Sequence, residues 1–215
     1  MKGYRAAACR LPAVIKITTT MFATTNNDTA IQLLQAIGLT EAALSGRLQS
    51  LVTTDARYLK DLKINVTNAL GAATLTKKEA YLIGLAVAVN EKQAALQTAF
   101  EALALQEGAT DKEVAEAISC TSLMNTNNVF YRFRHFVNKE FYNTTPAGIR
   151  MSIMANPVLG KEFFELLSLV ISALNGCEMC VTSHEEALLK HGTGQQRILD
   201  AVRLGAVLRS VTVLL

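Results

Sequence analysis

Three positions in the chain carry the sequence pattern that starts an α-helix. Thr76 and Thr110 each stand three residues before a glutamate, and Thr193 stands three residues before Gln196. In such a capping box, the two side chains bind backbone N–H groups that the first helical turn leaves free. Apolar residues at helical spacing follow Thr76, as is typical of a helix with a buried face. The pattern predicts three helix starts and favours a helical fold.

The rest of the chain agrees with a helical fold. No segment alternates apolar and polar residues over the two-residue period of a half-buried strand. The 215 residues include only 3 prolines, and alanine and leucine, which favour helices, are abundant. Residues 161–174 predict a buried helix and residues 177–190 predict the next one, with Asn175 and Gly176 between them. We therefore predict an all-α fold.

Two segments of the chain resemble each other. The segment that begins at Leu82 aligns with the one that begins at Leu167 when one gap is allowed. Both run from a helix into a glycine and then into the threonine of a capping box. This similarity predicts an internal duplication of a helical unit, with a degenerate copy over about 76–124 and an active copy over about 161–212.

The two copies differ where one of them carries reactive side chains. The active copy has Cys177, Cys180 and His184, whereas the alignment places Lys92, Ala95 and Ala99 at these positions of the degenerate copy. We infer that one copy keeps the helical framework and the other carries the chemistry.

The N-terminal residues differ in composition from the rest. Four basic residues precede the first acidic residue, Asp28, and threonines are frequent before it. We expect residues 1–27 to be a disordered or loosely attached extension, and residues 28–215 to form a single helical domain. The apolar stretch after the basic start is too short for a signal peptide, so we expect a cytoplasmic location, where thiols stay reduced.

The charge and apolar content exclude some classes of partner. The net charge is +3, but without the four N-terminal basic residues the 18 acidic residues slightly outnumber the basic ones. This near-neutral body has no basic stripe for nucleic acid, and no apolar run has the roughly 18 residues of a membrane span. Half of the residues are hydrophobic and only 18% are charged. We expect part of this apolar surplus to be buried between subunits of a homo-oligomer.

A pair of cysteines with a nearby histidine is the strongest chemical signal. Cys177 and Cys180 lie three residues apart, on adjacent turns of one helical face, so their sulfurs can come within disulfide distance. His184 lies four residues after Cys180 on the same face, where its ring can exchange a proton with that thiol. Gly176 is placed to open the helix, whose N-terminal dipole would lower the pKa of a thiol in the first turn. The arrangement indicates a redox-active site.

The helix before the cysteines carries a carboxylate among apolar residues. Glu165 has phenylalanines on one side and leucines on the other, where burial without a partner is costly. If the two helices pack together, Glu165 reaches His184 or a water beside the thiols. The alternative is a solvated helix face, and the spacing alone supports both readings equally.

Two other functions fit the same residues. Cys177, Cys180, His184 and His191 are four potential zinc ligands, although one short helix closes poorly around a tetrahedral ion and His191 stands where a histidine caps a helix end. A binding or structural helical protein would instead hold both thiols as inert, buried groups.

The remaining candidate residues are expected to be structural. Cys120 is expected to be a core thiol and Cys9 to be incidental in the extension. His135 is expected to pack or hydrogen-bond, and the aromatic residues over 127–142, which recur at helical spacings, to pack into the core.

Three stretches of the sequence resemble one known family. "NTNNVFYRFRHF", "GIRMSIMANP" and "FELLSLVISALNGCEMCVTSHE" are similar to the AhpD-type alkylhydroperoxidases of the carboxymuconolactone decarboxylase superfamily. The resemblance runs from about Tyr58 to the C-terminus. The family motif places a glutamate twelve residues before a Cys-x-x-Cys and a histidine four residues after it, and Glu165, Cys177, Cys180 and His184 match each element.

The resemblance implies a function and a role for each residue of the motif. It implies an antioxidant thiol peroxidase that reduces organic hydroperoxides, in which Cys180 is peroxidatic, Cys177 is resolving, and His184 and Glu165 form a proton relay. The fold would be helical with an internal duplication, and the protein would assemble as a trimer. No cofactor would be bound, because the lipoyl group of a carrier protein would supply electrons and an AhpC-type peroxiredoxin would be a further partner.

One residue departs from the family pattern. Met179 stands just before the second cysteine, where a family member has a histidine linked to the relay. Methionine cannot carry a proton, so the relay would run through Glu165, His184 and water. We expect a slower peroxidase, or a disulfide reductase that mainly passes electrons to a peroxiredoxin and has little peroxidase activity of its own.

Overall fold

The computed structural model describes residues 20–215, and all regular elements in this range are helical. The predicted all-α fold is therefore confirmed. The elements are α1 (Thr20–Ala36), η1 (Glu41–Ala43), α2 (Gly46–Thr53), α3 (Tyr58–Leu70), α4 (Lys77–Asn90), α5 (Ala94–Gln106), α6 (Asp111–Val137), α7 (Glu140–Thr144), η2 (Ser152–Met154), α8 (Lys161–Leu174), α9 (Glu178–Lys190) and α10 (Gln195–Thr212). No helix in the described range is both long and apolar enough to cross a bilayer.

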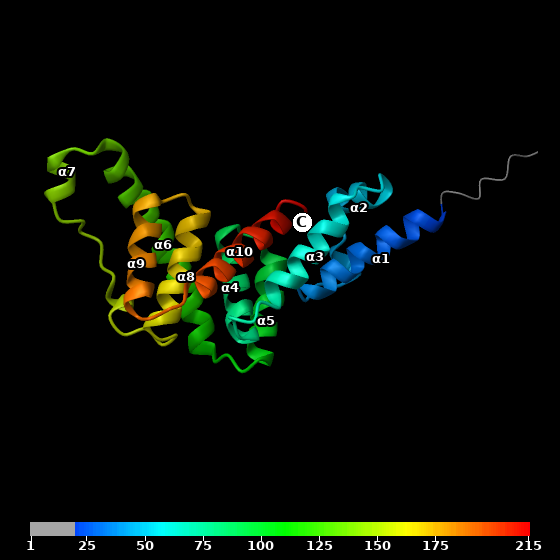
Figure 1. Cartoon of the computed structure of the whole chain (residues 1–215), viewed down its shortest axis with the longest axis horizontal. Coiled ribbons are helices and arrows are strands. Elements are labelled where there is room, and N and C mark those ends of the chain that lie inside the picture. Colours follow the sequence, from blue (N-terminus) through cyan, green and yellow to red (C-terminus); the bar gives the residue numbers. More distant parts are fainter. Residues whose placement is uncertain (1–19) are drawn as a thin grey trace, which may run out of the picture.

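The N-terminal part of this range already belongs to a helix. α1 begins at Thr20, ahead of the boundary expected at residue 28, and residues 1–19 of the expected extension lie outside the described residues. α1 packs on α3 at one end of the molecule, whereas α6, α8 and α9 lie toward the other end (Figure 1). α4 and α10 lie between these ends, so they connect the two parts of the molecule.

Two of the three predicted capping boxes are confirmed. The threonine hydroxyls of Thr76 and Thr110 accept from the backbone of the glutamate three residues on, and each glutamate accepts from the threonine backbone in return. The third box is wrong, because α10 begins after Gly194. The backbone N–H of Thr193 binds the carbonyl of Leu188 and so closes α9. The Thr193 hydroxyl donates to Glu162 instead, at 3.0 Å.

Two three-helix units, α4–α5–α6 and α8–α9–α10, follow the same path. α4 and α8 have 14 residues each, and each is followed by a three-residue turn and a 13-residue helix. The middle residue of each turn has a positive φ, 59° at Lys92 and 68° at Gly176. The next residues, Gln93 and Cys177, have nearly the same φ and ψ angles.

These turns correct the alignment of the two copies by one residue. Because the turns superimpose in conformation, Gln93 stands at the position of Cys177, Leu96 at that of Cys180 and Phe100 at that of His184, with Tyr81 at that of Glu165. The sequence alignment, which chose Lys92, Ala95 and Ala99, was already shifted by one residue at its start, where it paired Leu82 with Leu167. The structural correspondence keeps one offset through the three helices and needs no gap.

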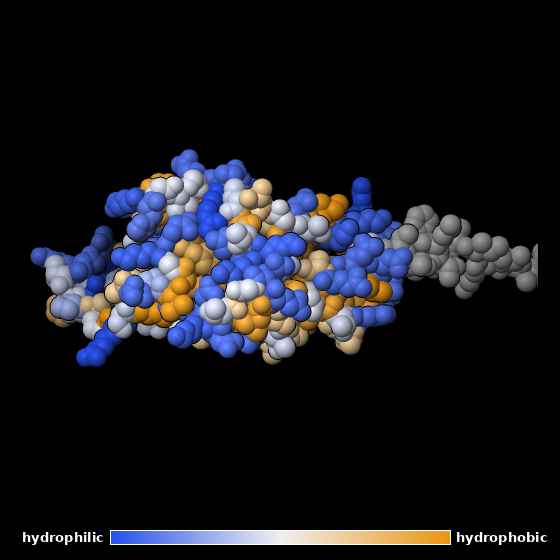
Figure 2. Space-filling view, turned by 90° about the horizontal axis from the view of Figure 1, so that it is seen from below, coloured by the Kyte–Doolittle hydropathy of each residue, from blue (hydrophilic) through white to orange (hydrophobic). Residues whose placement is uncertain are grey.

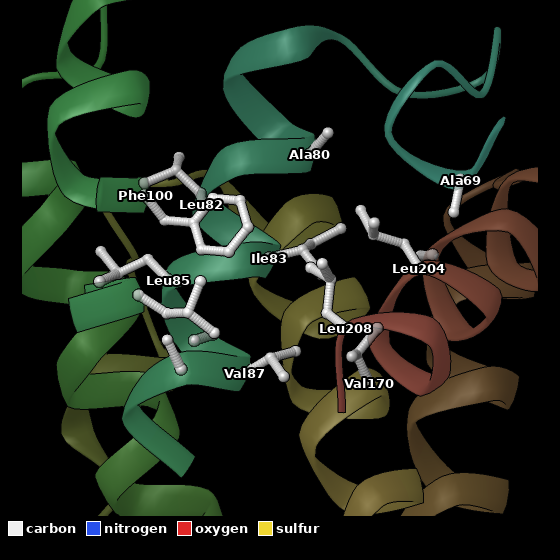
Figure 3. Close-up of a cluster of buried hydrophobic side chains, with 14 of the residues drawn as sticks. Ala69, Ala80, Leu82, Ile83, Leu85, Val87, Phe100, Val170, Leu204 and Leu208 are labelled. Atoms are coloured by element: carbon white, nitrogen blue, oxygen red, sulfur yellow. The ribbon is translucent and has the colours of Figure 1, made fainter. Parts of the chain in front are cut away.

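The core lies where the two units meet. α6 packs on both α4 and α8, and α10 packs on both α8 and α4. α4 is apolar around its circumference, as expected for a helix enclosed on all sides, and residues 82–88 are all buried. Figure 3 shows its side chains between Phe100 of α5 on one side and Leu204 and Leu208 of α10 on the other.

One arginine joins the starts of the two units. Arg197 of α10 binds Glu79 in the first turn of α4 at 2.6 Å and Glu162 in the first turn of α8 at 2.9 Å. Burial of Glu79 opposes its charge, but the hydrogen bonds from Arg197 and Thr76 outweigh burial and hold its pKa below the ordinary value. This ion-pair network therefore stays charged near neutral pH.

The aromatic residues near the end of α6 were predicted to pack in the core, and most of them do not. Phe136 is 74% exposed and Phe141 is 70% exposed, and Phe133 and Tyr142 are also exposed. α6 is 27 residues long, which corresponds to about 40 Å. Its last turns and α7 project at the end opposite α1 (Figure 1). The aromatic residues do recur at helical spacing, but this part of α6 contacts the short α7, as in the ring contact of Phe133 with Tyr142, and not the core.

Apolar side chains also reach the surface elsewhere. Figure 2 shows hydrophobic areas between hydrophilic ones along one face of the molecule. Exposed large apolar residues occur on α3, α6 and α10, among them Ile64, Val129 and Leu199. Part of the apolar surplus of the composition is therefore exposed in the single chain.

Substitution of Gly84 tests how tightly the core is packed. A Cβ atom at Gly84 would lie 2.7 Å from ring atoms of the fully buried Phe100. We expect Gly84→Ala to lower the free energy of unfolding by about 1–2 kcal/mol, because overpacking outweighs the better helix propensity of alanine. Urea unfolding measures the change. Gly46→Ala is the control, because nothing lies within 4 Å of that position, and an equal loss there would contradict the packing argument.

The predicted core thiol is confirmed and should be unreactive. Cys120 is fully buried beside Ser168, and burial raises the pKa of its thiol to about 12. At pH 8 only about one thiol in ten thousand would be ionised. We expect mass spectrometry to find Cys120 unlabelled after iodoacetamide treatment of the reduced, native protein, and labelled after denaturation. Labelling at similar rates in both states would contradict this.

Candidate active site

The turn after α8 positions the two cysteines. Gly176 has a φ of 68°, a conformation that side chains disfavour, and the turn ends α8 through the bond from the Cys177 N–H to the Ser172 carbonyl. Gly176 therefore closes α8, whereas it had been expected to open the next helix. Cys177 is the N-cap of α9 and Cys180 is its third residue, so both lie at the helix end where N–H groups favour a thiolate.

The two thiols are joined to each other. The Cys177 and Cys180 sulfurs form a disulfide, with the Cα atoms 5.3 Å apart. Cys177 has no exposed surface, whereas Cys180 is 7% exposed. An incoming reagent therefore meets Cys180 first, and Cys177 lies behind it.

Glu165 and His184 form a pair across α8 and α9. The Glu165 Oε2 atom lies 2.6 Å from Nδ1 of His184, and both side chains are mostly buried. Of the two alternatives for Glu165, the structure shows the contact with His184 and not a solvated helix face. An ionised carboxylate can only accept, so a neutral His184 ring would donate to it from Nδ1 and present Nε2 as a base. Such a carboxylate–histidine pair orients the ring for proton transfer.

Cys180 and His184 face one pocket of about 320 Å³. The pocket lies between α6, α9 and the segment that includes η2. Its lining is Asn127, Tyr131, Met151, Met154, Met179, Cys180, Ser183 and His184. The three methionines and the tyrosine make the wall mainly apolar, and a few polar groups gather near the sulfur. Such a site suits a small organic molecule with one reactive polar end.

A network of buried amides holds the turn before the cysteines, and sequence reasoning missed it. Asn128 of α6 donates to Ser172 at 2.8 Å and accepts from Asn175 at 2.9 Å. Asn90 of α4 donates to Asn175 at 3.1 Å, and Arg132 donates to the Asn175 carbonyl. The available signal was a group of asparagines in α6, which are poor helix formers and need a reason to be buried.

The other predicted residues lie away from the disulfide or have structural contacts. His191 is exposed and is the C-cap of α9. His135 lies 3.4 Å from Glu178, and its ring is tilted against that of Phe136 with centroids 6.1 Å apart. Cys9 lies outside the described residues. Between residues 20 and 215, no group of three or more histidine, cysteine, aspartate or glutamate side chains is arranged to hold a metal ion.

Met179 lines the pocket that Cys180 and His184 face. It is 38% exposed and contributes to the pocket wall beside Cys180. A thioether is only a weak hydrogen-bond acceptor and has no proton to give. Met179 therefore adds no proton carrier to the pair that Glu165 and His184 form beside the pocket.

Comparison with known proteins places this geometry in one family. The family described as the carboxymuconolactone decarboxylase family matches residues 142–214, which include all four residues of the motif. The alkyl hydroperoxide reductase AhpD of Anaeromyxobacter sp. (strain Fw109-5) is 38% identical over 156 residues, covering 73% of this chain and 84% of that protein.

Two further relatives give the same result. The alkyl hydroperoxide reductase AhpD of Rhodopseudomonas palustris (strain BisB18) is 38% identical, covering 73% of this chain and 86% of the relative. That of Beijerinckia indica subsp. indica is 39% identical, covering 74% of this chain and 87% of the relative. Because these relatives match over most of both chains, the protein belongs to the AhpD-type carboxymuconolactone decarboxylase superfamily.

Proposed function

We propose that this protein is a thiol peroxidase that reduces organic hydroperoxides to alcohols through a Cys177–Cys180 dithiol and disulfide cycle. The observation that carries the proposal is the pocket in which Cys180 and His184 lie together, with Cys177 bonded behind the first and Glu165 behind the second. The name of the relatives, alkyl hydroperoxide reductase, supports the same reaction.

The first step oxidises Cys180. In the reduced protein, His184 takes the Cys180 proton and the thiolate attacks the terminal oxygen of the hydroperoxide. The O–O bond breaks, an S–O bond forms, and the alkoxide takes the proton back from His184 and leaves as the alcohol. Cys180 becomes a sulfenic acid. Glu165 stabilises the charged imidazole while it holds the proton.

The second step forms the disulfide. The Cys177 sulfur attacks the Cys180 sulfur, the S–O bond breaks, and the hydroxyl leaves as water with the Cys177 proton. The chain already holds the two Cα atoms 5.3 Å apart, within the range that a disulfide requires. This step therefore needs little backbone movement.

The third step returns the dithiol. We propose that a dihydrolipoyl group on a carrier protein attacks the more accessible Cys180, and that its second thiol then completes the exchange. The protein gains two electrons and the lipoyl group becomes a cyclic disulfide. A lipoyl arm is slender and apolar, which suits a pocket walled by methionines. We propose an AhpC-type peroxiredoxin as a further partner. We also propose that this protein is cytoplasmic and forms a homotrimer, in which contacts between subunits cover exposed aromatic residues.

The second candidate is a disulfide reductase that serves a peroxiredoxin and has little peroxidase activity of its own. Met179 favours it, because this side chain borders Cys180 without offering a proton to a leaving alkoxide. In this candidate the Cys177 and Cys180 thiols reduce an oxidised peroxiredoxin by thiol–disulfide exchange and become the disulfide themselves. This exchange replaces the first two steps, and the third step is unchanged.

Single-turnover oxidation of cysteine variants tests the proposed function. With cumene hydroperoxide, we expect Cys177→Ser to accumulate a stable sulfenic acid on Cys180, because the resolving thiol is gone, and Cys180→Ser to consume no peroxide. Dimedone trapping with mass spectrometry identifies the oxidised residue. Cys120→Ala is the control and should form the disulfide as the wild type does. Equal peroxide consumption by wild type and both serine variants would refute the proposal.

Substitution of Met179 separates the two candidates. We expect Met179→His to raise the rate of cumene hydroperoxide reduction by about tenfold, because a titratable ring beside Cys180 adds an acid to the relay. Turnover is measured with dihydrolipoamide as the electron donor. Met179→Gln is the matched control, since glutamine is polar but does not titrate and so cannot act as a general acid. An unchanged or lower rate for the histidine variant would contradict a gap in the relay.

A further inference from the structure

Asn127 of α6 is a buried polar residue of the pocket that has no role in the steps above. It is 5% exposed and lines the same pocket as Cys180 and His184. Its Oδ1 atom is one of two buried side-chain oxygen or nitrogen atoms in the described part of the chain that have no hydrogen-bond partner. The other belongs to Asn26 in α1, so within the pocket this feature is specific to Asn127.

The rest of the amide is also weakly held. The Nδ2 atom of Asn127 donates to the thioether sulfur of Met151 at 3.2 Å. Sulfur of this kind is a weak acceptor, so a ligand oxygen can replace it at little cost. A buried amide oxygen without a hydrogen-bond partner is unfavourable, because it loses its hydration and gains no bond in return. The amide of this pocket-lining residue therefore has an acceptor without a partner and a donor with only a weak one.

The neighbouring Asn128 shows that the lack of hydrogen-bond partners is specific to Asn127. Asn128 lies one position further on α6, and its amide is satisfied by Ser172 and Asn175. Asn128 holds the backbone before the cysteines, whereas Asn127 holds nothing of comparable strength. The two residues have the same chemistry but different surroundings.

We propose that Asn127 is a substrate-binding residue that hydrogen-bonds the hydroperoxide group. This inference rests on the proposed function. A hydroperoxide offers one O–H donor and two oxygen acceptors, and the amide offers the complementary acceptor and donors. The Asn127 N–H donates to the alkoxy oxygen as that oxygen gains negative charge, and His184 supplies the proton. No covalent bond to Asn127 forms or breaks.

The apolar wall explains why such a residue is needed. Met151, Met154 and Met179 contact the organic part of a substrate without fixing its orientation. Attack by Cys180 requires the terminal oxygen to face the sulfur, with the alkoxy oxygen directed away from it. A hydrogen bond from Asn127, which lines the pocket from α6 while Cys180 lines it from α9, would set that direction.

The test compares Asn127→Leu with wild type in two reactions of the reduced protein. Stopped-flow oxidation with cumene hydroperoxide reports attack on the peroxide, and iodoacetamide labelling of Cys180 reports the reactivity of the thiolate alone. We expect the peroxide rate to fall about tenfold or more, as when a donor to a developing oxyanion is removed. The labelling rate should stay within about twofold of wild type.

Thermal unfolding of two variants supplies the structural control. Asn127→Leu removes an unsatisfied group and should leave the melting temperature unchanged or higher. Asn128→Leu removes the hydrogen bond to the Ser172 hydroxyl and the acceptor of the Asn175 amide N–H, and should lower it by about 5 °C. If leucine at position 127 prevents folding, Asn127→Ala removes the amide without added bulk and has the same two expected rates.

The possible outcomes separate the two hypotheses. An Asn127 variant that reacts with the hydroperoxide as fast as wild type would overturn the role of Asn127 and leave the proposed function intact. A parallel loss of both rates would also overturn it, because Asn127 would then act on the thiolate and not on the peroxide. Wild-type protein that reacts with iodoacetamide but not with the hydroperoxide would refute the proposed function itself.

Discussion

The left-handed turn at Gly176 determines where every reactive group of the site lies. It ends α8 and reverses the chain so that α9 packs back against α8. Cys177 then becomes the N-cap of α9 and Cys180 its third residue, while the reversal brings His184 to Glu165. The amides of α4 and α6 that bind Asn175 keep this turn in place. Disulfide distance, proton relay and pocket wall all follow from one change of chain direction.

The first unit shows what the same turn does without the reactive residues. Lys92 adopts the same positive φ as Gly176, and α5 packs against α4 as α9 does against α8. At the positions of Glu165 and His184 stand Tyr81 and Phe100, whose ring centroids lie 6.3 Å apart. The Glu165–His184 contact of one copy is thus an aromatic contact in the other. One framework supports either a core or a reactive centre, depending on two pairs of side chains.

The sequence predicts well where structure depends on nearby residues. The buried helix over residues 161–174 and the capping boxes at Thr76 and Thr110 depend on local spacing, and the structure has them as expected. The contact of Glu165 with His184 stayed undecided, because it depends on how two helices pack. Long-range neighbours explain the errors: Thr193 is engaged by the end of α9 and by Glu162. The aromatic end of α6 projects past its neighbours, and the partners of Asn128 lie more than 40 positions away.

Arg197 makes the two units mutually dependent. It lies in α10 of the second unit, yet it neutralises Glu79 in the first turn of α4 as well as Glu162 in the first turn of α8. At the equivalent position of the first unit stands Glu113, which binds Lys78 within that unit. The bridge between the copies is therefore carried by one copy alone. Without the second unit Glu79 would lose its guanidinium, and without the first unit Arg197 would keep only Glu162. The bridge therefore ties the stability of each unit to the presence of the other.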